Sequence, residues 1–448
     1  MTLTKSLLSG TAISLALSGA ALADGHIAFP VGEGDFNWDS YNAFAEAHDL
    51  AGQSLTITGP WTGLDKDLFD SVVAYFEEAT GAEVEYSGSD SFESDFVIAA
   101  QAGSAPDMGV FPQPGGVAER ARAGDLVPLG DGVAEWMNDN YAAGDSWVDL
   151  GSVDGEMYAF PYKADVKSLV WYVPEAFEEA GYDIPESYED LKALTEQIVA
   201  DGGTPWCIGL GSGAATGWPA TDWVEDIMLR TATPETYDQW VSNEIPFDDP
   251  AVLNAIEEFG YFARNEDFAN GGAQAVVSTD FRDSPTGLFQ FPPECYMHRQ
   301  ASFIPTFFPE GTDVGLDADF FYFPASAEQD LGQPVLGGGT LFARTVDNEA
   351  TDAFIAYLQT PIAHEIWMAQ SGFLTPFTGA NADVFPSETQ QALNEILTNA
   401  TTFRFDASDL MPSEIGQGVF WTGMVDYVTG ESAEDAAGAI QERWDAIK

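Results

Sequence analysis

The chain has 448 residues, of which 45% are hydrophobic and 13% aromatic, and this content excludes a wholly disordered protein. Its formal net charge is −58, from 15 Lys and Arg against 73 Asp and Glu, which argues against nucleic acid and anionic membranes as partners. The acidic residues are scattered and form no D-x-[DN]-x-[DN]-G loop, so we interpret them as a solubilising surface suited to salty surroundings rather than as calcium sites.

The first residues have the pattern of a secretory signal. Lys5 precedes a run of apolar and small residues over 7–22, and Ala21-Leu22-Ala23 supplies a cleavage site. The run is too short and too rich in Gly, Ser and Ala for a membrane anchor, and the absence of a following Cys argues against a lipoprotein. Residues 1–23 are therefore predicted to be a cleaved signal peptide, and the mature protein is expected in the periplasm.

A chain of this length exceeds what one hydrophobic core usually serves, so we expect two lobes. Residues 24–52 show little periodicity and are predicted to be an N-terminal extension. Strands and helices then alternate, which is typical of a parallel sheet covered by helices. The predicted elements are a strand at 54–58, a helix from 65 to Gly81, a strand at 84–86, a helix at 91–102 and a strand at 106–111.

The same alternation resumes in the second half. Ser187 is predicted to cap a helix, and a strand is expected at 206–210. A glycine-rich strand at 335–343 precedes a helix at 349–358, and Ser432 is expected to begin the last helix. No repeat or long linker separates the two halves, which indicates that the chain crosses between the lobes several times.

No pattern supports catalysis. The four histidines do not have metal-ligand spacing, which argues against a zinc site. Ser212 in GLGSGAATG resembles a nucleophile elbow or a dinucleotide loop, but Leu210 and Ala214 replace the elbow's glycines and Trp218-Pro219 follows. We interpret this segment as a turn. With 73 acidic residues any carboxylate spacing occurs, so we predict no enzyme, no catalytic residue, no cofactor and no metal.

Binding of a sugar fits the residues better. Aromatic side chains stack on the C–H faces of sugars, while carboxylates, amides and cations bond to the hydroxyls. Such groups share the loops after predicted strands, where α/β sheets place their ligands. These groups are Trp61 with Asp65, Gln113, Lys163 with Asp165, Trp218 with Asp222, and Trp421. A lone Trp is more often part of a core, so the pattern alone favours a sugar only slightly.

Cys207 and Cys295 are the two cysteines of the chain. In an oxidising compartment an even pair favours one disulfide, and the alternative is two buried thiols.

Four blocks of the sequence resemble the solute-binding proteins of carbohydrate ABC importers, the superfamily that includes maltose-binding protein. They contain LTITGPW, YAFPYKADVKSLVWY, VLGGGTLFAR and DLMPSEIGQGVFW, in the order the family has them. With weaker matches between the blocks, the resemblance covers nearly all of the mature chain. It implies an α/β, two-lobed periplasmic-binding-protein fold with a hinge, which closes over a sugar.

In this family the chain leaves the first lobe after an aromatic-Pro pair, here Phe160-Pro161, and returns with a Gly-rich strand, here near Gly337–Gly339. The implied division places the first lobe at 53–163 and 336–395, and the second lobe at 164–335 and 396–448. The two cysteines then both fall in the second lobe, which is compatible with a disulfide between its sheet and a loop.

The resemblance also implies a set of ligand positions. An acid at the hinge grips sugar hydroxyls, here Asp165 with Lys163 beside it, and Trp421 stacks on a glucosyl ring. The full set of implied ligand residues is Pro60, Trp61, Phe111, Gln113, Lys163, Asp165, Trp218, Asp222, Tyr296, His298, Arg299, Gly338 and Trp421.

Departures from the pattern narrow the expected ligand. Pro114 and Gly115 stand where maltose-binding protein has an Asp-Arg pair, which argues against a maltodextrin-like mode. GWPATDW and PPECYMHRQASF look like the α-glucoside branch, whose ligands include trehalose, maltose and sucrose. We therefore expect a monomer that captures an α-glucoside disaccharide and delivers it to the permease subunits of an ABC transporter. The alternatives are a secreted carbohydrate-active enzyme, or the same fold binding a polyol, an osmolyte or a polyamine.

Overall fold

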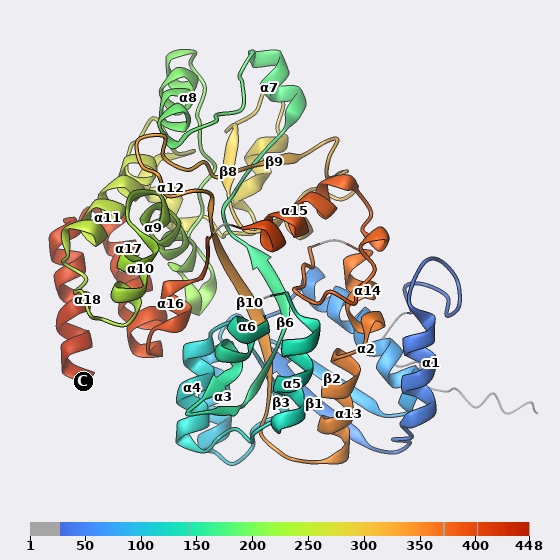
Figure 1. The fold of residues 1–448 in the computed structure, drawn as a ribbon. Helices are drawn as coiled ribbons and strands as arrows, with labels where there is room; N and C mark the ends of the chain where they lie inside the picture. The colour runs from blue at the N-terminus through green and yellow to red at the C-terminus, as the bar shows by residue number, and fades with distance from the viewer. Residues whose placement is uncertain (1–26, 143, 371, 401, 448) are drawn as a thin grey trace, which may run out of the picture.

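The computed structural model describes residues 27–447 apart from 143, 371 and 401, so the predicted signal peptide lies outside the described residues. The chain forms two α/β lobes, as predicted, and the strands β6 and β10 run from one lobe toward the other (Figure 1). In that view the first lobe lies below and the second lobe above and to the left. No described helix combines the length and the apolar character that a membrane crossing requires.

A six-stranded sheet forms the centre of the first lobe. The strand order is β11-β10-β3-β1-β2, and β6 pairs with β10. β1 is parallel to β2 and β3, whereas β10 is antiparallel to β3 and β6. The strands are β1 (Ser54–Gly59), β2 (Glu83–Gly88), β3 (Met108–Phe111), β6 (Ala159–Val166), β10 (Pro334–Arg344) and β11 (Thr402–Phe405).

Helices cover this sheet where the sequence predicted them. The predicted helix after residue 65 is α2, which ends at Gly81 in the left-handed conformation, with φ 74°. The predicted helix at 349–358 is α13 (Glu349–Leu358), which begins with a capping box at Asn348. The lobe contains α2 (Leu64–Thr80), α3 (Phe92–Gln101), α4 (Pro114–Ala123), α5 (Asp131–Asn140), α6 (Gly144–Gly151), α13, α14 (Pro361–Met368) and the pair β4 (Ser152–Val153) and β5 (Glu156–Met157).

The N-terminal extension holds a helix that the sequence did not predict, α1 (Trp38–Ala47). The Asn37 side chain caps it by accepting a hydrogen bond from the backbone N–H of Ser40. Trp38, Tyr41 and Phe44 are buried and the helix contacts α2 and α14. These three aromatics join the core of the first lobe.

The second lobe packs its helices around a small antiparallel sheet, in which β7 lies between β8 and β9. Ser187 caps α8 and Ser432 accepts a hydrogen bond from Asp435 N–H at the start of α18, both as predicted. The elements are β7 (Leu169–Tyr172), α7 (Pro174–Ala180), α8 (Tyr188–Ala200), α9 (Trp218–Thr231), α10 (Pro234–Val241), α11 (Pro250–Ala263), α12 (Gly272–Ser278), β8 (Met297–Arg299), β9 (Asp319–Tyr322), α16 (Ala407–Leu410), α17 (Trp421–Thr429) and α18 (Ala433–Ile447). α15 (Glu388–Asn399) contacts both β6 and β10.

The prediction of a strand at 206–210 is wrong, because this segment does not form a strand in the structure. This segment is extended, but its N–H groups bond to several separate partners: Trp206 to Phe268, Cys207 to Met297 and Leu210 to Val276. No single neighbouring segment runs beside it far enough to form a ladder, and Trp206 makes only isolated bridges.

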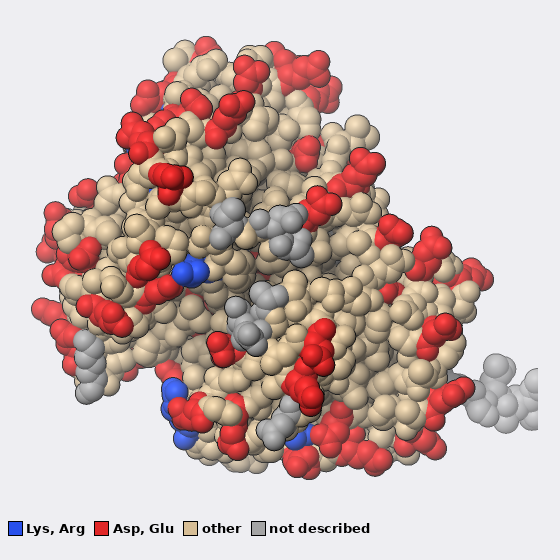
Figure 2. Space-filling model, viewed as in Figure 1, with Lys and Arg blue, Asp and Glu red and all other residues tan. Residues whose placement is uncertain are grey.

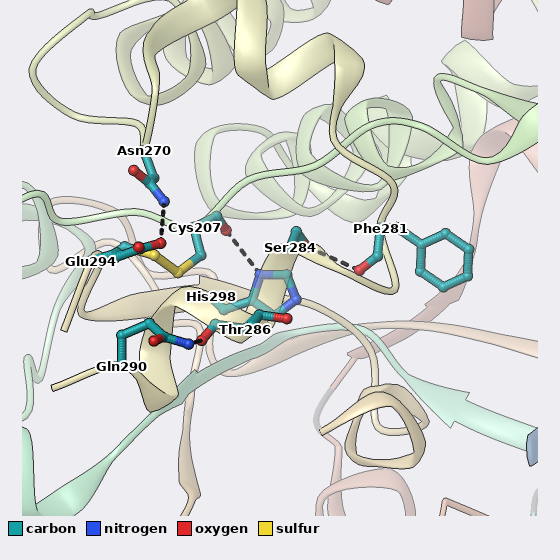
Figure 3. Close-up of a disulfide and its surroundings, with 9 residues drawn as sticks. Cys207, Asn270, Phe281, Ser284, Thr286, Gln290, Glu294 and His298 are labelled. Atoms are coloured by element: carbon teal, nitrogen blue, oxygen red, sulfur yellow. Dashed lines mark hydrogen bonds between the residues drawn. A yellow bond between two sulfur atoms is a disulfide. The ribbon is translucent and has the colours of Figure 1, made fainter. Parts of the chain in front are cut away.

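Cys207 and Cys295 form a disulfide in the second lobe (Figure 3). It ties the extended segment after α8 to the segment before β8. Beside it, His298 bonds through Nδ1 to the Cys207 carbonyl oxygen at 2.8 Å.

Acidic side chains are spread over the outer surface. Figure 2 shows Asp and Glu across both lobes with few Lys or Arg among them. They form no single patch on the visible face, in agreement with the scattered pattern of the sequence.

Candidate functional site

A cavity lies between the two lobes and beside the crossing strands. It encloses about 990 Å³ of space not filled by protein, including solvent at its mouth. The first lobe contributes the segments at 60–65, 89–93 and 112–113, and the second lobe contributes segments around Trp218, Phe281 and Trp421. Ligand sites of small molecules typically have this size and this position between lobes.

A row of charged side chains from β6 and from Lys167, the residue that follows it, lines the cavity. Lys163, Asp165 and Lys167 are spaced two residues apart, so alternation along the extended chain places them on the same face. At roughly 3.3 Å per residue, the row is about 13 Å long from Lys163 to Lys167. Strand β6 and the residue that follows it therefore supply charged groups to both ends of the cavity, here called the Lys163 end and the Lys167 end.

At the Lys163 end one lysine pairs with one carboxylate. Lys163 Nζ lies 2.5 Å from Asp165 Oδ1, and both side chains are buried. Asp65 lies near this pair, and burial raises its pKa to about 6 although Lys163 opposes the shift. Lys163 also lies 5.4 Å from the centre of the Phe303 ring, which lines the same end.

Gln113 and Glu93 extend the Lys163 end toward the first lobe. Gln113 Nε2 donates a hydrogen bond to Glu93 Oε1 at 3.1 Å. Burial raises the pKa of Glu93, and the bond from Gln113 partly offsets that rise. The pair presents an amide and a carboxyl group to the cavity, both suited to sugar hydroxyls.

At the Lys167 end one lysine contacts two carboxylates. Lys167 Nζ lies 3.0 Å from Asp222 Oδ1 and also contacts Asp406. Asp222, Glu225 and Asp406 bring carboxyl oxygens within 4.8 Å of one another, which is close enough for a metal site. The ammonium group of Lys167 already supplies the cation of this cluster, so the donor set does not call for a metal.

Two glycines allow the backbone to approach closely at this end. Gly217 precedes α9 with φ 113°, and a Cβ there would lie 2.3 Å from the carbonyl oxygen of Trp421. The absence of a side chain thus brings the start of α9, with Trp218, against the start of α17, with Trp421. At Gly338 a Cβ would lie 2.9 Å from Cε of Lys167, so this glycine leaves room for the lysine to cross β10.

An ion pair at the cavity joins the two lobes. Arg282 of the second lobe lies 2.6 Å from Asp90 of the first lobe, measured from Nη2 to Oδ1. The guanidinium also lies 4.4 Å from the centre of the Phe281 ring, and all three residues line the cavity. The pair bridges the two lobes in the present arrangement.

Most of the ligand residues implied by the family resemblance do lie together. The predicted residues that line the cavity are Pro60, Trp61, Gln113, Lys163, Asp165, Trp218, Asp222 and Trp421. The turn that contains Ser212 also reaches the cavity as a short 3₁₀ helix (Gly213–Ala215), preceded by Ser212.

Five predicted residues do not line the cavity. Phe111 is buried between Phe92 and Phe96, with ring centres 5.1 and 4.9 Å away. Tyr296 packs against Tyr182 in the core of the second lobe. Gly338 only makes room for Lys167, as described above.

The other two of these five, His298 and Arg299, are buried behind the cavity. Burial lowers the pKa of His298 to about 4, so its ring is neutral, and Nδ1 bonds to the Cys207 carbonyl. Arg299 Nη2 lies 3.0 Å from Asp226 Oδ2 and Nη1 lies 3.7 Å from Asp222 Oδ2. Arg299 therefore supports Asp222 from behind the cavity wall.

Several lining residues were missing from the predicted set. Lys167 continues the alternation of Lys163 and Asp165, so the sequence contained a signal for it. Asp65 had been named beside Trp61 among the groups suited to a sugar, but the set implied by the resemblance does not contain it. Arg282, Ser408 and Asp409 come from distant segments that no local pattern connects to the cavity.

Comparisons with known proteins agree with this architecture. The sequence model of the bacterial extracellular solute-binding proteins matches residues 63–365. The alpha-glucosides-binding periplasmic protein AglE of Rhizobium meliloti (strain 1021) is 60% identical, over 99% of this chain and 100% of that protein. The osmoprotective compounds-binding protein GgtB of Synechocystis sp. is 42% identical, over 88% of this chain and 92% of that protein.

Solved structures share the fold at lower identity. The bacterial solute receptor AcbH superposes with a TM-score of 0.76 and 18% identity, over 89% of this chain and 100% of that chain. A chitin oligosaccharide binding protein has a TM-score of 0.74 and 19% identity, over 88% of this chain and 98% of that chain. At such identities the likeness establishes the fold alone.

Proposed function

This chain belongs to the bacterial extracellular solute-binding proteins, and we propose that it captures an α-linked glucoside between its lobes and delivers it to an ABC permease. The proposal places the protein in the periplasm and gives it a binding role rather than a catalytic one. The relative named for α-glucosides supports the ligand class, because it matches this chain over its full length at 60% identity.

The cavity itself is the observation that carries the proposal. Flat aromatic faces, among them Trp218 and Trp421, stand beside the charged row of β6. This combination suits a polar ring that has apolar faces and many hydroxyl groups. Because residues of both lobes line the cavity, we infer that the ligand enters when the lobes separate and is enclosed when they close.

A calorimetric titration tests the proposal. We expect trehalose, maltose or sucrose at micromolar concentration to bind and to raise the melting temperature, because a ligand of the folded state stabilises it. Galactose-containing and β-linked disaccharides serve as controls. No binding by any sugar of the panel would contradict the proposal, and slow disappearance of the bound sugar would instead indicate an enzyme.

A second candidate ligand follows from the GgtB relative, which is named for osmoprotective compounds and is 42% identical. An osmoprotective polyol would present its hydroxyl groups to the same charged and amide side chains of the cavity. Competition between such a compound and the disaccharides in the same titration ranks the two ligand classes directly.

A further inference from the structure

The charges behind the Lys167 end do not balance. Three cations and five carboxyl groups lie together there, and each side chain belongs to a residue that is less than a tenth exposed. The cations are Lys167, Arg230 and Arg299, and the acids are Asp222, Glu225, Asp226, Asp406 and Asp409.

Ion pairs account for three of the acids. Asp226 lies 2.6 Å from Arg230 and 3.0 Å from Arg299, while Asp222 and Asp406 contact Lys167. Among the described residues, no cation lies within 4.0 Å of the Glu225 or Asp409 carboxyl group. These two acids are therefore buried beside other acids without a counter-ion of their own.

A buried carboxylate without a counter-ion is so costly that the group keeps its proton instead. Burial raises the pKa of both Glu225 and Asp409 well above the ordinary range. Repulsion by Asp406 adds to both shifts, and attraction to Lys167 opposes them only in part. With both acids neutral, the acids that remain, Asp222, Asp226 and Asp406, equal the three cations in number. Burial also raises the pKa of Asp222, to about 7, against the attraction of Lys167.

The two acids differ in what they can reach. Glu225 is fully buried on α9, and its Oε1 accepts a hydrogen bond from Ser408 N–H at 2.9 Å. Asp409, on α16, lines the cavity together with Ser408 and Trp218. Of the two acids without a counter-ion, Asp409 is therefore the one exposed to a ligand.

We propose that Asp409 meets the ligand as a neutral carboxylic acid and donates a hydrogen bond to one of its oxygens. This inference rests on the proposed function, which supplies a ligand with acceptor oxygens. Asp165 acts in the opposite sense, because it forms an ion pair with Lys163 and the oxygens of a carboxylate only accept hydrogen bonds. The two ends of the cavity thus recognise different groups on the ligand, a donor at the Lys163 end and an acceptor at the Lys167 end.

The protonation of Asp409 also separates neutral from cationic ligands. A neutral sugar leaves the proton in place, whereas a polyamine would favour the ionised form and expel the proton. Titrations in two buffers with different ionisation enthalpies measure this exchange. We expect no proton release with the disaccharide that binds best.

Matched isosteric variants test the proposal. In Asp409→Asn the amide replaces the acid as a hydrogen-bond donor, so we expect disaccharide affinity within about threefold of the wild type. In Asp165→Asn an ionised acceptor is lost, and we expect affinity to fall by about tenfold or more. Equal losses in the two variants would overturn the proposal, provided that both melt at temperatures close to the wild type.

A measurement on the wild-type protein covers the case in which a variant does not fold. The ¹³C chemical shift of the Asp409 side-chain carboxyl at neutral pH reports its protonation directly. The shift of a protonated acid is expected, and the shift of a carboxylate would overturn the proposal. Because this readout needs no ligand, it stands apart from the proposed function, which fails only if no solute of the sugar panel binds.

Discussion

The two ends of the cavity are built from the same kinds of side chain but differ in how their charges are compensated. At the Lys163 end, one ammonium group meets one carboxylate at 2.5 Å. At the Lys167 end, one ammonium group meets two carboxylates, and further acids surround them. Under the proposal for Asp409, the cavity uses carboxyl groups both as acceptors at one end and as a donor at the other.

Removal of the two lysines tests this difference most strongly. Lys167→Met leaves Asp222 and Asp406 buried without their ammonium partner, so we expect the free energy of unfolding to fall by about 3–5 kcal/mol. Lys163→Met leaves only Asp165 without its ammonium partner, so the free energy of unfolding should fall by about 1–3 kcal/mol. Urea denaturation of both variants measures the two losses. Equal losses would show that the second carboxylate at Lys167 adds nothing.

Truncation of Trp421 and of Trp61 separates a loss of ligand binding from a loss of stability. Trp421 lines the cavity and is buried, but it lies outside the three hydrophobic clusters of the described residues. Trp421→Ala should therefore weaken disaccharide binding about tenfold, or about 1.4 kcal/mol, while the protein stays folded. Trp61 contacts the rings of Phe69 and Trp367 in the first-lobe core, so Trp61→Ala should lower the melting temperature as well. Calorimetry together with thermal melting separates the two effects. A Trp421→Ala variant with wild-type affinity would remove Trp421 from the site.

The pH dependence of binding should differ between the two ends. The pKa of Asp65 is about 6, so Asp65 loses its proton as the pH rises through this value, and the ionised form is the stronger acceptor for sugar hydroxyls. We expect the affinity for a neutral disaccharide to increase severalfold from pH 5 to pH 7. Asp65→Asn should flatten this rise, while Asp409→Asn should leave it unchanged. A rise that persists in Asp65→Asn would assign the titration to another group.

Salt should act on the surface more than on the cavity. The net charge of −58 comes largely from acids in contact with water, where salt screens their mutual repulsion. We expect the melting temperature to rise by a few degrees between dilute and molar sodium chloride. The affinity of the enclosed site should change less over the same range. A constant melting temperature would show that surface repulsion contributes little to stability.

The regular part of the molecule was predictable from the sequence. β1, α2 and α13 follow local periodicity and capping residues, and they occur where these patterns indicated. The Lys163 end was also within reach, because the family resemblance implied that Asp165 lies at the hinge with Lys163 beside it. The sequence placed both residues in a loop, whereas the structure has them in strand β6. Lys167 has the same alternation and could have been added from the sequence alone.

The Lys167 end could not be predicted in the same way. Lys167 and Asp406 are 239 residues apart, and only the pairing of β11 with β10 brings them together. Phe111 and His298 show the opposite error, in which a residue is predicted to bind the ligand but does not reach it. Both occupy segments next to the cavity, but their side chains point away from it into the protein interior. The direction of a side chain depends on packing between distant segments, which local patterns do not report.

Strand β6 carries two sets of side chains at once, and this sharing limits how the protein can diversify. Tyr162, Ala164 and Val166 alternate with the charged row and belong to the first-lobe core. Insertion of a single residue near the start of the strand would exchange the two sets, sending three charges into the core and three apolar groups toward the ligand. Relatives with altered specificity should therefore differ by substitution along this strand and keep its length. Libraries that aim at new ligands should follow the same constraint.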